Sequence, residues 1–310
     1  MGKRSIGKSL VITKARMIIQ AVATLLSNIH LPNIVRGQIY QGHAKIMCVP
    51  GLNCYSCPAA TGACPIGALQ AVAGSSKFSF SYYVTGLLML IGVTLGRFAC
   101  GYLCPFGWFQ ELIHRIPGRK LKTDKFMALR YLKYVILVML VVMLPIMVTN
   151  ELGMGTPYFC KYLCPQGILE GALPLAAANK GIRNALGALF SWKLTLLVLI
   201  IMLSRLIYRP FCKWLCPLGA AYALFNRIAL LGMTVDDAKC ISCGRCRMVC
   251  RMDVDVRRTS NHAECIRCGM CIRECPADAI RYCFGFWKEK PEDSQKKWSY
   301  INEDKINIQH

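Results

Sequence analysis

The stretch "CKWLCPLG" (residues 212–219) lies where a long apolar segment meets a basic one. The same pattern, Cys-x-aromatic-Leu-Cys-Pro-x-Gly, occurs as "CGYLCPFG" (100–107) and "CKYLCPQG" (160–167). Proline disfavours helical geometry in the residue before it and suits the first turn of a helix. We therefore expect the second cysteine of each copy immediately before a new helix, where free N–H groups favour an anionic thiolate or cofactor.

Composition indicates a membrane protein that binds metal. The chain has 310 residues, 55% of them hydrophobic and 17% charged, which is enough for one membrane body and one small domain. Its 19 cysteines stand at short fixed spacings beside apolar segments, and Lys14 and Arg16 interrupt the only apolar run that a signal peptide could use. Thiolate ligation is therefore favoured over a disulfide framework. The net charge of +22 does not indicate nucleic-acid binding, because the basic residues flank apolar segments.

Four segments are predicted to span a membrane, at about residues 15–31, 78–98, 131–149 and 186–208. About twenty helical residues cross a hydrocarbon layer of about 30 Å. Lys and Arg are concentrated before the first span and between the second and third. Because such residues stay in the cytoplasm, we expect a multi-pass protein of the cell membrane with both termini cytoplasmic.

The membrane part contains a repeat. "CPIGALQ" (64–70) resembles "CPQGILE" (164–170), each before a span, and "RFACGYLCPFG" (97–107) resembles "RPFCKWLCPLG" (209–219), each after one. Two such halves packed side by side would bring cysteines together at both ends of the spans. The alternative is duplicated helix packing with cysteine as a small apolar residue. The expected inner membrane site comprises Cys100, Cys104, Cys212 and Cys216, and the outer one draws on Cys54, Cys57, Cys64, Cys160 and Cys164.

Straight spans place these two sites nearly a bilayer apart. Two apolar segments that follow cysteines, "PIGALQAVAG" (65–74) and "PQGILEGALPL" (165–175), are too short to cross the membrane. If they fold as re-entrant halves, the gap between the sites becomes shorter.

The most specific motif follows the membrane part. "CISCGRCRMVC" (240–250) and "CIRCGMCIRECP" (265–276) both have the spacing Cys-x2-Cys-x2-Cys-x3-Cys of bacterial two-cluster ferredoxins. In that arrangement the fourth cysteine of each run ligates the other cluster. A zinc site is the alternative, but zinc knuckles need no third cysteine in the run. The spacing assigns Cys240, Cys243, Cys246 and Cys275 to one [4Fe–4S] cluster, and Cys265, Cys268, Cys271 and Cys250 to the second.

The stretches "FACGYLCPFGWFQELIHRIP" (98–117) and "RPFCKWLCPLGAAYALFNRIAL" (209–230), together with the double ferredoxin motif, resemble polyferredoxin-type membrane proteins of the NapH and MauN kind. The resemblance implies four spans, cytoplasmic termini, two [4Fe–4S] clusters and electron transfer between the quinone pool and redox partners, as in a quinol dehydrogenase. This chain departs from that family in its motif at 160–167 and in "NCYSCPAATGACP" (53–65). These features look closer to a broader set of 4Fe–4S binding membrane proteins, so nitrate reduction is not carried over.

We therefore predict an α-helical membrane protein of about four pseudo-repeated transmembrane helices with a C-terminal α+β two-cluster ferredoxin-like domain. The predicted parts are a membrane domain (1–210), a junction helix (211–232), the domain for two [4Fe–4S] clusters (233–285) and a polar tail (286–310).

The predicted function is electron transfer between the quinone pool or a cytoplasmic donor and a redox partner protein. The expected cofactors are two [4Fe–4S] clusters, one or two more at the membrane cysteines, and quinone. Membrane lipid is an expected partner, nucleic acid is not, and no catalytic residue is predicted. The alternative function is a redox assembly factor that reduces a metal or thiols of another enzyme, because Cys54 and Cys57 have the spacing of a redox-active pair.

Overall fold

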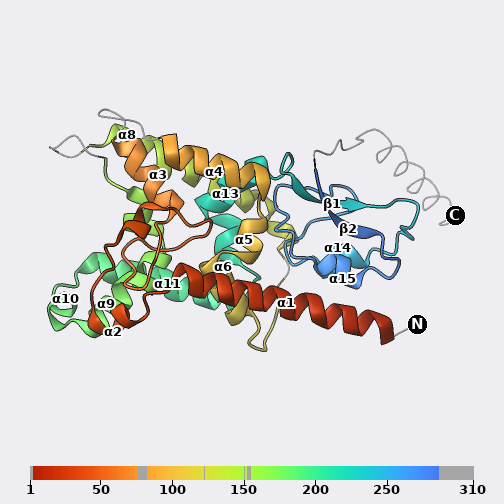
Figure 1. Ribbon diagram of the computed structural model, residues 1–310, viewed down its shortest axis with the longest axis horizontal. Helices are drawn as coiled ribbons and strands as arrows, with labels where there is room; N and C mark the ends of the chain where they lie inside the picture. Colours follow the sequence, from red (N-terminus) through yellow and green to blue (C-terminus); the bar gives the residue numbers. More distant parts are fainter. Residues whose placement is uncertain (1–2, 76–81, 122, 150, 152–154, 286–310) are drawn as a thin grey trace.

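The computed structural model describes residues 3–75, 82–121, 123–149, 151 and 155–285. A helical body and a small C-terminal domain lie end to end, and the long helix α1 (Lys3–Ser27) runs along both (Figure 1). The C-terminal domain contains the antiparallel strands β1 (Leu231–Val235) and β2 (Ile280–Phe284). The predicted polar tail, 286–310, lies outside the described residues.

Two helical stretches within the described residues are long and apolar enough to cross a membrane. They are Phe126–Met147 and Ala188–Leu206 (α11), which coincide with the third and fourth predicted spans. For the second predicted span the structure gives only the 13-residue helix α4 (Tyr82–Thr94), and residues 78–81 lie outside the described part. The first overlaps α1, which has 25 residues, begins well before the predicted span and ends at Ser27, before the predicted end of that span. Two of the four spans thus have support, and the other two stay predictions.

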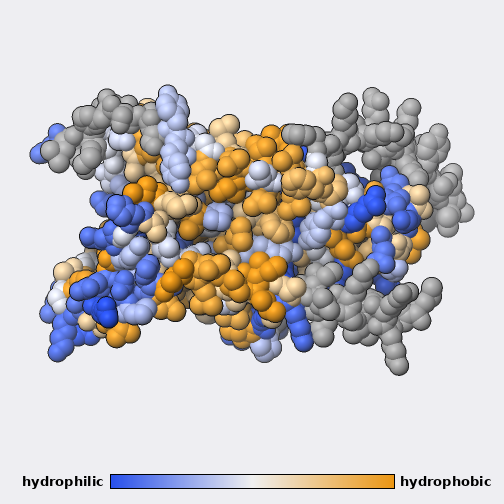
Figure 2. Space-filling model, viewed as in Figure 1, coloured by the Kyte–Doolittle hydropathy of each residue, from blue (hydrophilic) through white to orange (hydrophobic). Residues whose placement is uncertain are grey.

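Exposed apolar side chains surround the helical body. In Figure 2 hydrophobic residues cover the middle of the visible face, and hydrophilic residues gather toward both ends. A continuous apolar surface of this kind suits contact with lipid. The exposed apolar residues include Ile18, Val22 and Leu25 of α1, Val138 and Met139 of the Phe126–Met147 stretch, and Val198, Leu199 and Met202 of α11.

Short helices that begin at a proline fill the interior of the body. They are α3 (Pro65–Gly74), α6 (Pro105–His114) and α13 (Pro217–Phe225), and each is preceded by a cysteine in extended geometry. Helix α3 packs on α4, α6 packs on α1 and α11, and α13 packs on α4 and α7 (Leu132–Ile136). With ten, ten and nine residues these helices are too short to cross a membrane, which is what the re-entrant expectation requires of α3.

Proline also explains why two helical stretches contain π-helical turns, which are wider than α-helical ones. The π-helical segments η3 (Leu137–Met143) and η5 (Gly167–Ala172) come directly before α8 (Leu144–Met147) and α9 (Leu173–Ala178), which contain Pro145 and Pro174 near their starts. Proline donates no backbone hydrogen bond and crowds the preceding turn, and a wider turn accommodates it.

The segment 211–232, predicted as a junction helix, comprises most of α12 (Pro210–Trp214), all of α13 and the start of β1. Because α13 packs on α4 and α7, this segment is part of the helical body. The remaining elements are α2 (Pro32–Arg36), η1 (His43–Ile46), α5 (Phe98–Tyr102), η2 (Asp124–Tyr131), η4 (Phe159–Leu163), α10 (Lys180–Asn184), α14 (Arg245–Val249) and α15 (Met270–Glu274).

Candidate metal centres

The C-terminal domain brings its eight motif cysteines together in two groups of four. Each group lines a small cavity, and in each the fourth cysteine of one run joins the first three of the other run. This is the crossed grouping expected from the spacing. One cavity is lined by Cys240, Cys243, Cys246 and Cys275, and the other by Cys250, Cys265, Cys268 and Cys271.

The backbone has the same conformation at matching positions around the two cavities. Gly244 and Gly269 precede α14 and α15 with φ angles of 73° and 76°, a left-handed geometry that glycine adopts without strain. Two residues earlier, Ser242 and Arg267 also have positive φ angles, of 54° and 52°. Left-handed residues in such turns help to direct successive N–H groups into one concavity, which suits an anion.

Sulfur atoms in both halves accept backbone hydrogen bonds at matching positions. The amide of Val254 donates to Sγ of Cys250, and that of Ala279 donates to Sγ of Cys275, both at 3.4 Å. Burial raises the pKa of the Cys250 thiol to about 11. A metal is thus needed to hold such a buried sulfur as a thiolate near neutral pH.

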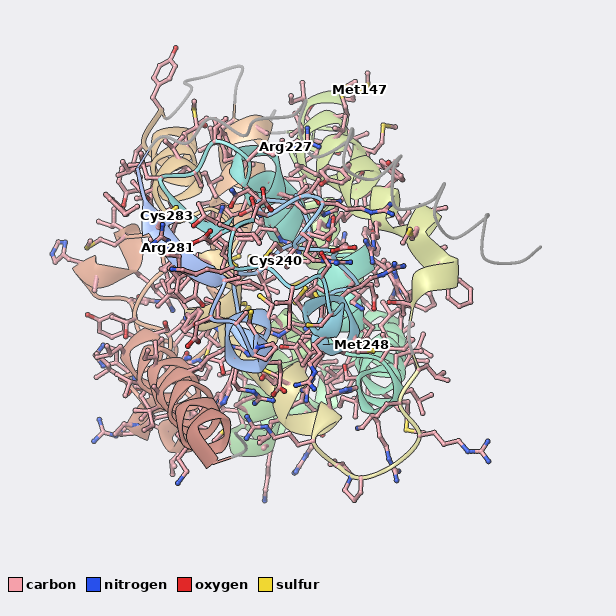
Figure 3. The ribbon with its side chains drawn as sticks, turned by 90° about the vertical axis from the view of Figure 1, so that its right-hand side faces the viewer. Met147, Arg227, Cys240, Met248, Arg281 and Cys283 are labelled. Carbon is pink, nitrogen blue, oxygen red and sulfur yellow. The ribbon has the colours of Figure 1, made fainter. Side chains whose placement is uncertain are left out.

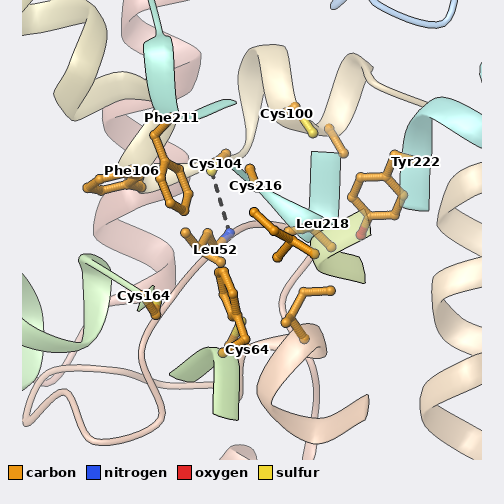
Figure 4. Packing of buried hydrophobic residues seen from close by; sticks show 14 of the residues in the cluster. Leu52, Cys64, Cys100, Cys104, Phe106, Cys164, Phe211, Cys216, Leu218 and Tyr222 are labelled. Atoms are coloured by element: carbon orange, nitrogen blue, oxygen red, sulfur yellow. Dashed lines mark hydrogen bonds between the residues drawn. The ribbon is translucent and has the colours of Figure 1, made fainter. Parts of the chain in front are cut away.

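The inner membrane cysteines also meet. Cys100 lies in α5 and Cys212 in α12, while Cys104 and Cys216 immediately precede α6 and α13. All four are buried, and the sulfurs lie within electrostatic range of one another in all six pairs. Figure 4 shows Cys100, Cys104 and Cys216 on one side of Leu52.

Hydrogen-bond donors reach three of these inner sulfurs. The amides of Gly107 and Gly219 donate to Sγ of the cysteine three residues earlier, Cys104 and Cys216, at 3.4 and 3.3 Å. Gln110 Nε2 donates to Sγ of Cys212 at 3.2 Å. Donors aimed at sulfur stabilise thiolates and tune the potential of an iron–sulfur cluster.

Two buried arginines, which were not among the predicted site residues, flank the inner group. Arg97 donates to the carbonyl oxygen of Cys212 and Arg209 to that of Cys100. Their signal is present in the sequence, because each stands three residues before the first cysteine of its motif. Both side chains are fully buried, and both Nε atoms have no hydrogen-bond partner. A buried cation with an unused donor fits an anionic group at this place.

Of the five cysteines predicted for the outer site, the structure brings four together. Cys54, Cys64, Cys160 and Cys164 come together, with electrostatic interaction in all six pairs. Cys57 interacts electrostatically with Cys54 of this group, but its Sγ donates to Oδ1 of Asn28.

Within the described residues, no three Cys, His, Asp or Glu side chains converge closely enough to ligate a single metal ion. The ferredoxin-type cysteines instead surround the two cavities described above.

The C-terminal domain docks on the helical body beside the inner group. A Cβ atom at Gly101 would lie 2.4 Å from the carbonyl oxygen of Ile266, so the two backbones touch between Cys100 and Cys265. The sulfur of Cys268 interacts electrostatically with Tyr102 and Tyr208 of the body. The second ferredoxin-type quartet therefore faces the inner membrane quartet.

Ion pairs fix this docking. Glu264 binds Arg97 at 2.6 Å and also Lys133, and all three residues are buried. Lys213, which lies between Cys212 and Cys216, binds Asp253 at 2.8 Å. Glu264 and Asp253 of the C-terminal domain thus each pair with cations of the helical body.

Two clefts open next to the ferredoxin-type cysteines. One of about 830 Å³ is lined by Arg130, Arg247, Cys243 and Cys250 among others, and one of about 450 Å³ by His114, Tyr208 and Cys250 among others. Met248 lines both, and Figure 3 labels it together with Cys240 in the view onto the end of the molecule that carries the C-terminal domain.

Comparison with known proteins supports the iron–sulfur assignment. Models for 4Fe–4S binding domains match residues 80–124, 135–173 and 189–233 in the helical body and residues 259–281 in the C-terminal domain. No solved structure matches the chain at a significant level.

Three curated proteins are similar to parts of the chain. An uncharacterized protein of Methanocaldococcus jannaschii is 28% identical over 68% of this chain and 83% of its own length, and a second is 24% identical over 55% and 57%. The regulatory protein NosR of Pseudomonas aeruginosa is 27% identical over 51% of this chain, which spans only 20% of that protein. The chain thus carries 4Fe–4S binding domains in both of its parts, and it is similar to other proteins over more than half of its length.

Proposed function

We propose that the chain is an iron–sulfur electron-transfer protein of the cell membrane, with both termini in the cytoplasm. The observation that carries this proposal is the backbone contact between Gly101 and Ile266, the residues that follow Cys100 of the inner quartet and Cys265 of the second ferredoxin-type quartet. An iron–sulfur cluster bound by such cysteines supplies one-electron transfer without proton or bond chemistry of its own. The resemblance to the NapH and MauN kind supports the same class of function.

The protein's own residues provide what such a site needs. Cys240, Cys243, Cys246 and Cys275 would hold one [4Fe–4S] cluster and Cys250, Cys265, Cys268 and Cys271 another. Cys100, Cys104, Cys212 and Cys216 would hold a third, compensated by Arg97 and Arg209. Burial by the docked domain excludes water from the contact between the second and third sites.

The two clefts suggest the partners. Cys243 is exposed at the edge of the larger cleft, where Arg130 and Arg247 supply positive charge, so we propose an acidic redox protein as the cytoplasmic partner. The smaller cleft lies beside Cys250 and is lined by His114 and Tyr208, and its mixed polar and apolar lining suits a quinone headgroup.

The alternative of a redox assembly factor requires an accessible Cys54–Cys57 pair. Cys57 is only 3% exposed, and burial raises the pKa of its thiol to about 12. Reactive thiols are partly exposed and have lowered pKa values, so electron transfer is the better supported function. A regulatory role like that in the name of NosR is not carried over, because the similarity covers a fifth of that protein.

The test uses the full chain, purified anaerobically in detergent and reduced with dithionite. Electron transfer predicts that a soluble quinone analogue reoxidises the protein and restores its visible absorption, and that C104S/C216S slows this reaction. Trapping of Cys57 in a mixed disulfide with another enzyme, without reaction with quinone, would favour the assembly factor. Protein that contains no iron or sulfide would refute both.

A further inference from the structure

We infer that Cys54, Cys64, Cys160 and Cys164 form a second membrane [4Fe–4S] site, joined to the inner site by the segment 50–54. The inference rests on the proposed function and extends it to the outer side of the helical body. Ligation of an assembled cluster would break four S–H bonds, form four bonds from iron to Sγ and release four protons, with no change of oxidation state.

The outer quartet repeats the local geometry of the inner one. Cys64 and Cys164 precede α3 and η5, as Cys104 and Cys216 precede α6 and α13, and the amides of Gly67 and Gly167 hydrogen-bond to the two outer sulfurs. A cysteine followed by Pro-x-Gly therefore receives a glycine N–H at all four places.

Two glutamines make the same three hydrogen bonds in the two sites. Gln70 Nε2 donates to Sγ of Cys160 at 3.1 Å and to the carbonyl of Ile66, and its Oε1 accepts from the amide of Phe159. Gln110 does the same with Cys212, Phe106 and Phe211. Because the inner pattern is reproduced atom for atom, packing of cysteine as a small apolar residue does not account for the outer group.

Two cations, the partly buried Lys193 and the buried Lys45, compensate negative charge at the outer site. Lys193 Nζ donates to the carbonyl oxygen of Cys160 at 3.1 Å, in the way that Arg209 donates to Cys100. Lys45 is 5% exposed, its Nζ has no hydrogen-bond partner, and it interacts electrostatically with Cys54. One carboxylate, Glu170, opposes them, so the surroundings carry a net positive charge that suits an anionic cluster.

The fourth ligand comes from a different place in the chain than in the inner site. Cys100 stands four residues before Cys104, but the residue four before Cys64 is Ala60. Cys54 takes that role instead, because Glu170 Oε2 accepts from its amide at 3.2 Å. At the other end of the segment Tyr222 Oη donates to the carbonyl of Pro50 at 3.1 Å.

The residues that hold this segment share one motif position. Gln70, Gln110, Glu170 and Tyr222 each stand six residues after the cysteine of their own Cys-Pro-x-Gly. Two of them bind a sulfur, and the other two fix the ends of the segment 50–54. The segment 50–54 is thus held in place by residues of both membrane sites.

The segment also brings the sites close together. The amide of Leu52 donates to Sγ of Cys104, and Leu52 lies between Cys104 on one side and Cys64 and Cys164 on the other (Figure 4). Because Cys54 follows two residues later, its Cα lies at most about 12 Å from that sulfur. The two sites are therefore neighbours, in contrast to the separation of nearly a bilayer that straight spans would impose.

The test is iron and acid-labile sulfide analysis of the full chain, purified anaerobically in detergent. Four clusters predict about 16 iron atoms in the wild type and about 12 in C64S/C164S. The matched control C57S changes a cysteine of the same loop outside the quartet and should retain about 16. In the reduced wild type, magnetic interaction between the two neighbouring membrane sites should broaden the paramagnetic resonance, and C64S/C164S should narrow it.

The possible outcomes separate this inference from the proposed function. About 12 iron atoms in the wild type, unchanged in folded C64S/C164S, would overturn the outer site and leave the proposed function intact. Fewer than about eight would overturn the proposed function itself. If C64S/C164S does not fold, the wild-type count still decides, since about 16 atoms require the outer site and about 12 exclude it.

Discussion

Arg209 donates a hydrogen bond of 2.7 Å from Nη1 to the carbonyl oxygen of Cys100. Arg97 makes the reciprocal bond to the carbonyl oxygen of Cys212 at 3.3 Å. Each half of the inner site is thus oriented by a cation from the other half. Each arginine also forms an ion pair with a carboxylate: Arg209 with Glu111 at 2.9 Å and Arg97 with Glu264 at 2.6 Å. This crossed arrangement supports the assignment of the inner cysteines to one shared site.

Replacing Arg209 by methionine should make the potential of the inner site more negative. A positive charge beside a cluster stabilises its reduced form, and for a one-electron couple each tenfold change in the equilibrium corresponds to about 59 mV. A shift of tens of millivolts in a redox titration followed by paramagnetic resonance is expected. The control is Arg205→Met, which removes an exposed arginine near the end of α11. Equal potentials in the two variants would contradict a role for Arg209 at the site.

Replacing Gln110 by leucine should lower the potential of the inner site without loss of iron. The change removes one neutral donor from Sγ of Cys212, which is worth about 1 kcal/mol, or a few tens of millivolts. Gln70→Leu is the matched control, because it removes the same bond from Cys160 and should leave the inner signal unchanged. A loss of inner iron in Gln110→Leu would instead mean that Gln110 is needed for folding of the site.

Replacing Glu264 by glutamine should loosen the C-terminal domain from the helical body. The change leaves the buried cations Arg97 and Lys133 without their carboxylate, which costs about 3–5 kcal/mol. Limited proteolysis in the segment 226–230, which links α13 to β1, should therefore become faster. The control Glu274→Gln changes a partly exposed carboxylate of the same domain and should leave proteolysis unchanged.

Low pH should loosen the C-terminal domain from the helical body, as Glu264→Gln does. Burial opposes ionisation of Glu264, but Arg97 and Lys133 prevail and lower its pKa to about 2, below the ordinary value of 4.5. The ion pairs therefore contribute their full stability above the ordinary pKa, and this stability is lost as the pH falls from about 4.5 toward 2. Thermal unfolding measured across that range should show a smaller pH dependence in Glu264→Gln than in the wild type.

Replacing Arg247 by glutamate should slow reduction of the protein by an acidic electron donor. Arg247 is exposed in the larger cleft beside Cys243, and electrostatic steering changes association rates by about tenfold or more at low salt. Stopped-flow reduction by an acidic ferredoxin, measured at several salt concentrations, provides the test. Arg183→Glu, at the opposite end of the molecule on α10, should react like the wild type. Equal rates for both variants would place the donor elsewhere.

The sequence by itself determined the features that depend on local spacing. The ferredoxin-type runs predicted the grouping of Cys250 and Cys275 with the opposite trio, because a run of this length cannot turn its fourth cysteine back onto its own site. The repeat likewise predicted that Cys104 and Cys216 precede helices, since proline excludes helical geometry in the residue before it. The apolar composition predicted the helices Phe126–Met147 and Ala188–Leu206.

Only the tertiary structure decided which outer cysteines belong together and how far apart the membrane sites lie. Cys54 and Cys57 are equivalent by spacing, and contacts with residues distant in sequence separate them: Glu170 holds Cys54 at the quartet, and Asn28 binds Cys57. The short distance to Cys104 arises because the amide of Leu52, within the segment 50–54, donates a hydrogen bond to Sγ of Cys104. Such contacts depend on how the helices that follow the four Cys-Pro-x-Gly motifs pack together, and the spacing within one motif does not fix that packing.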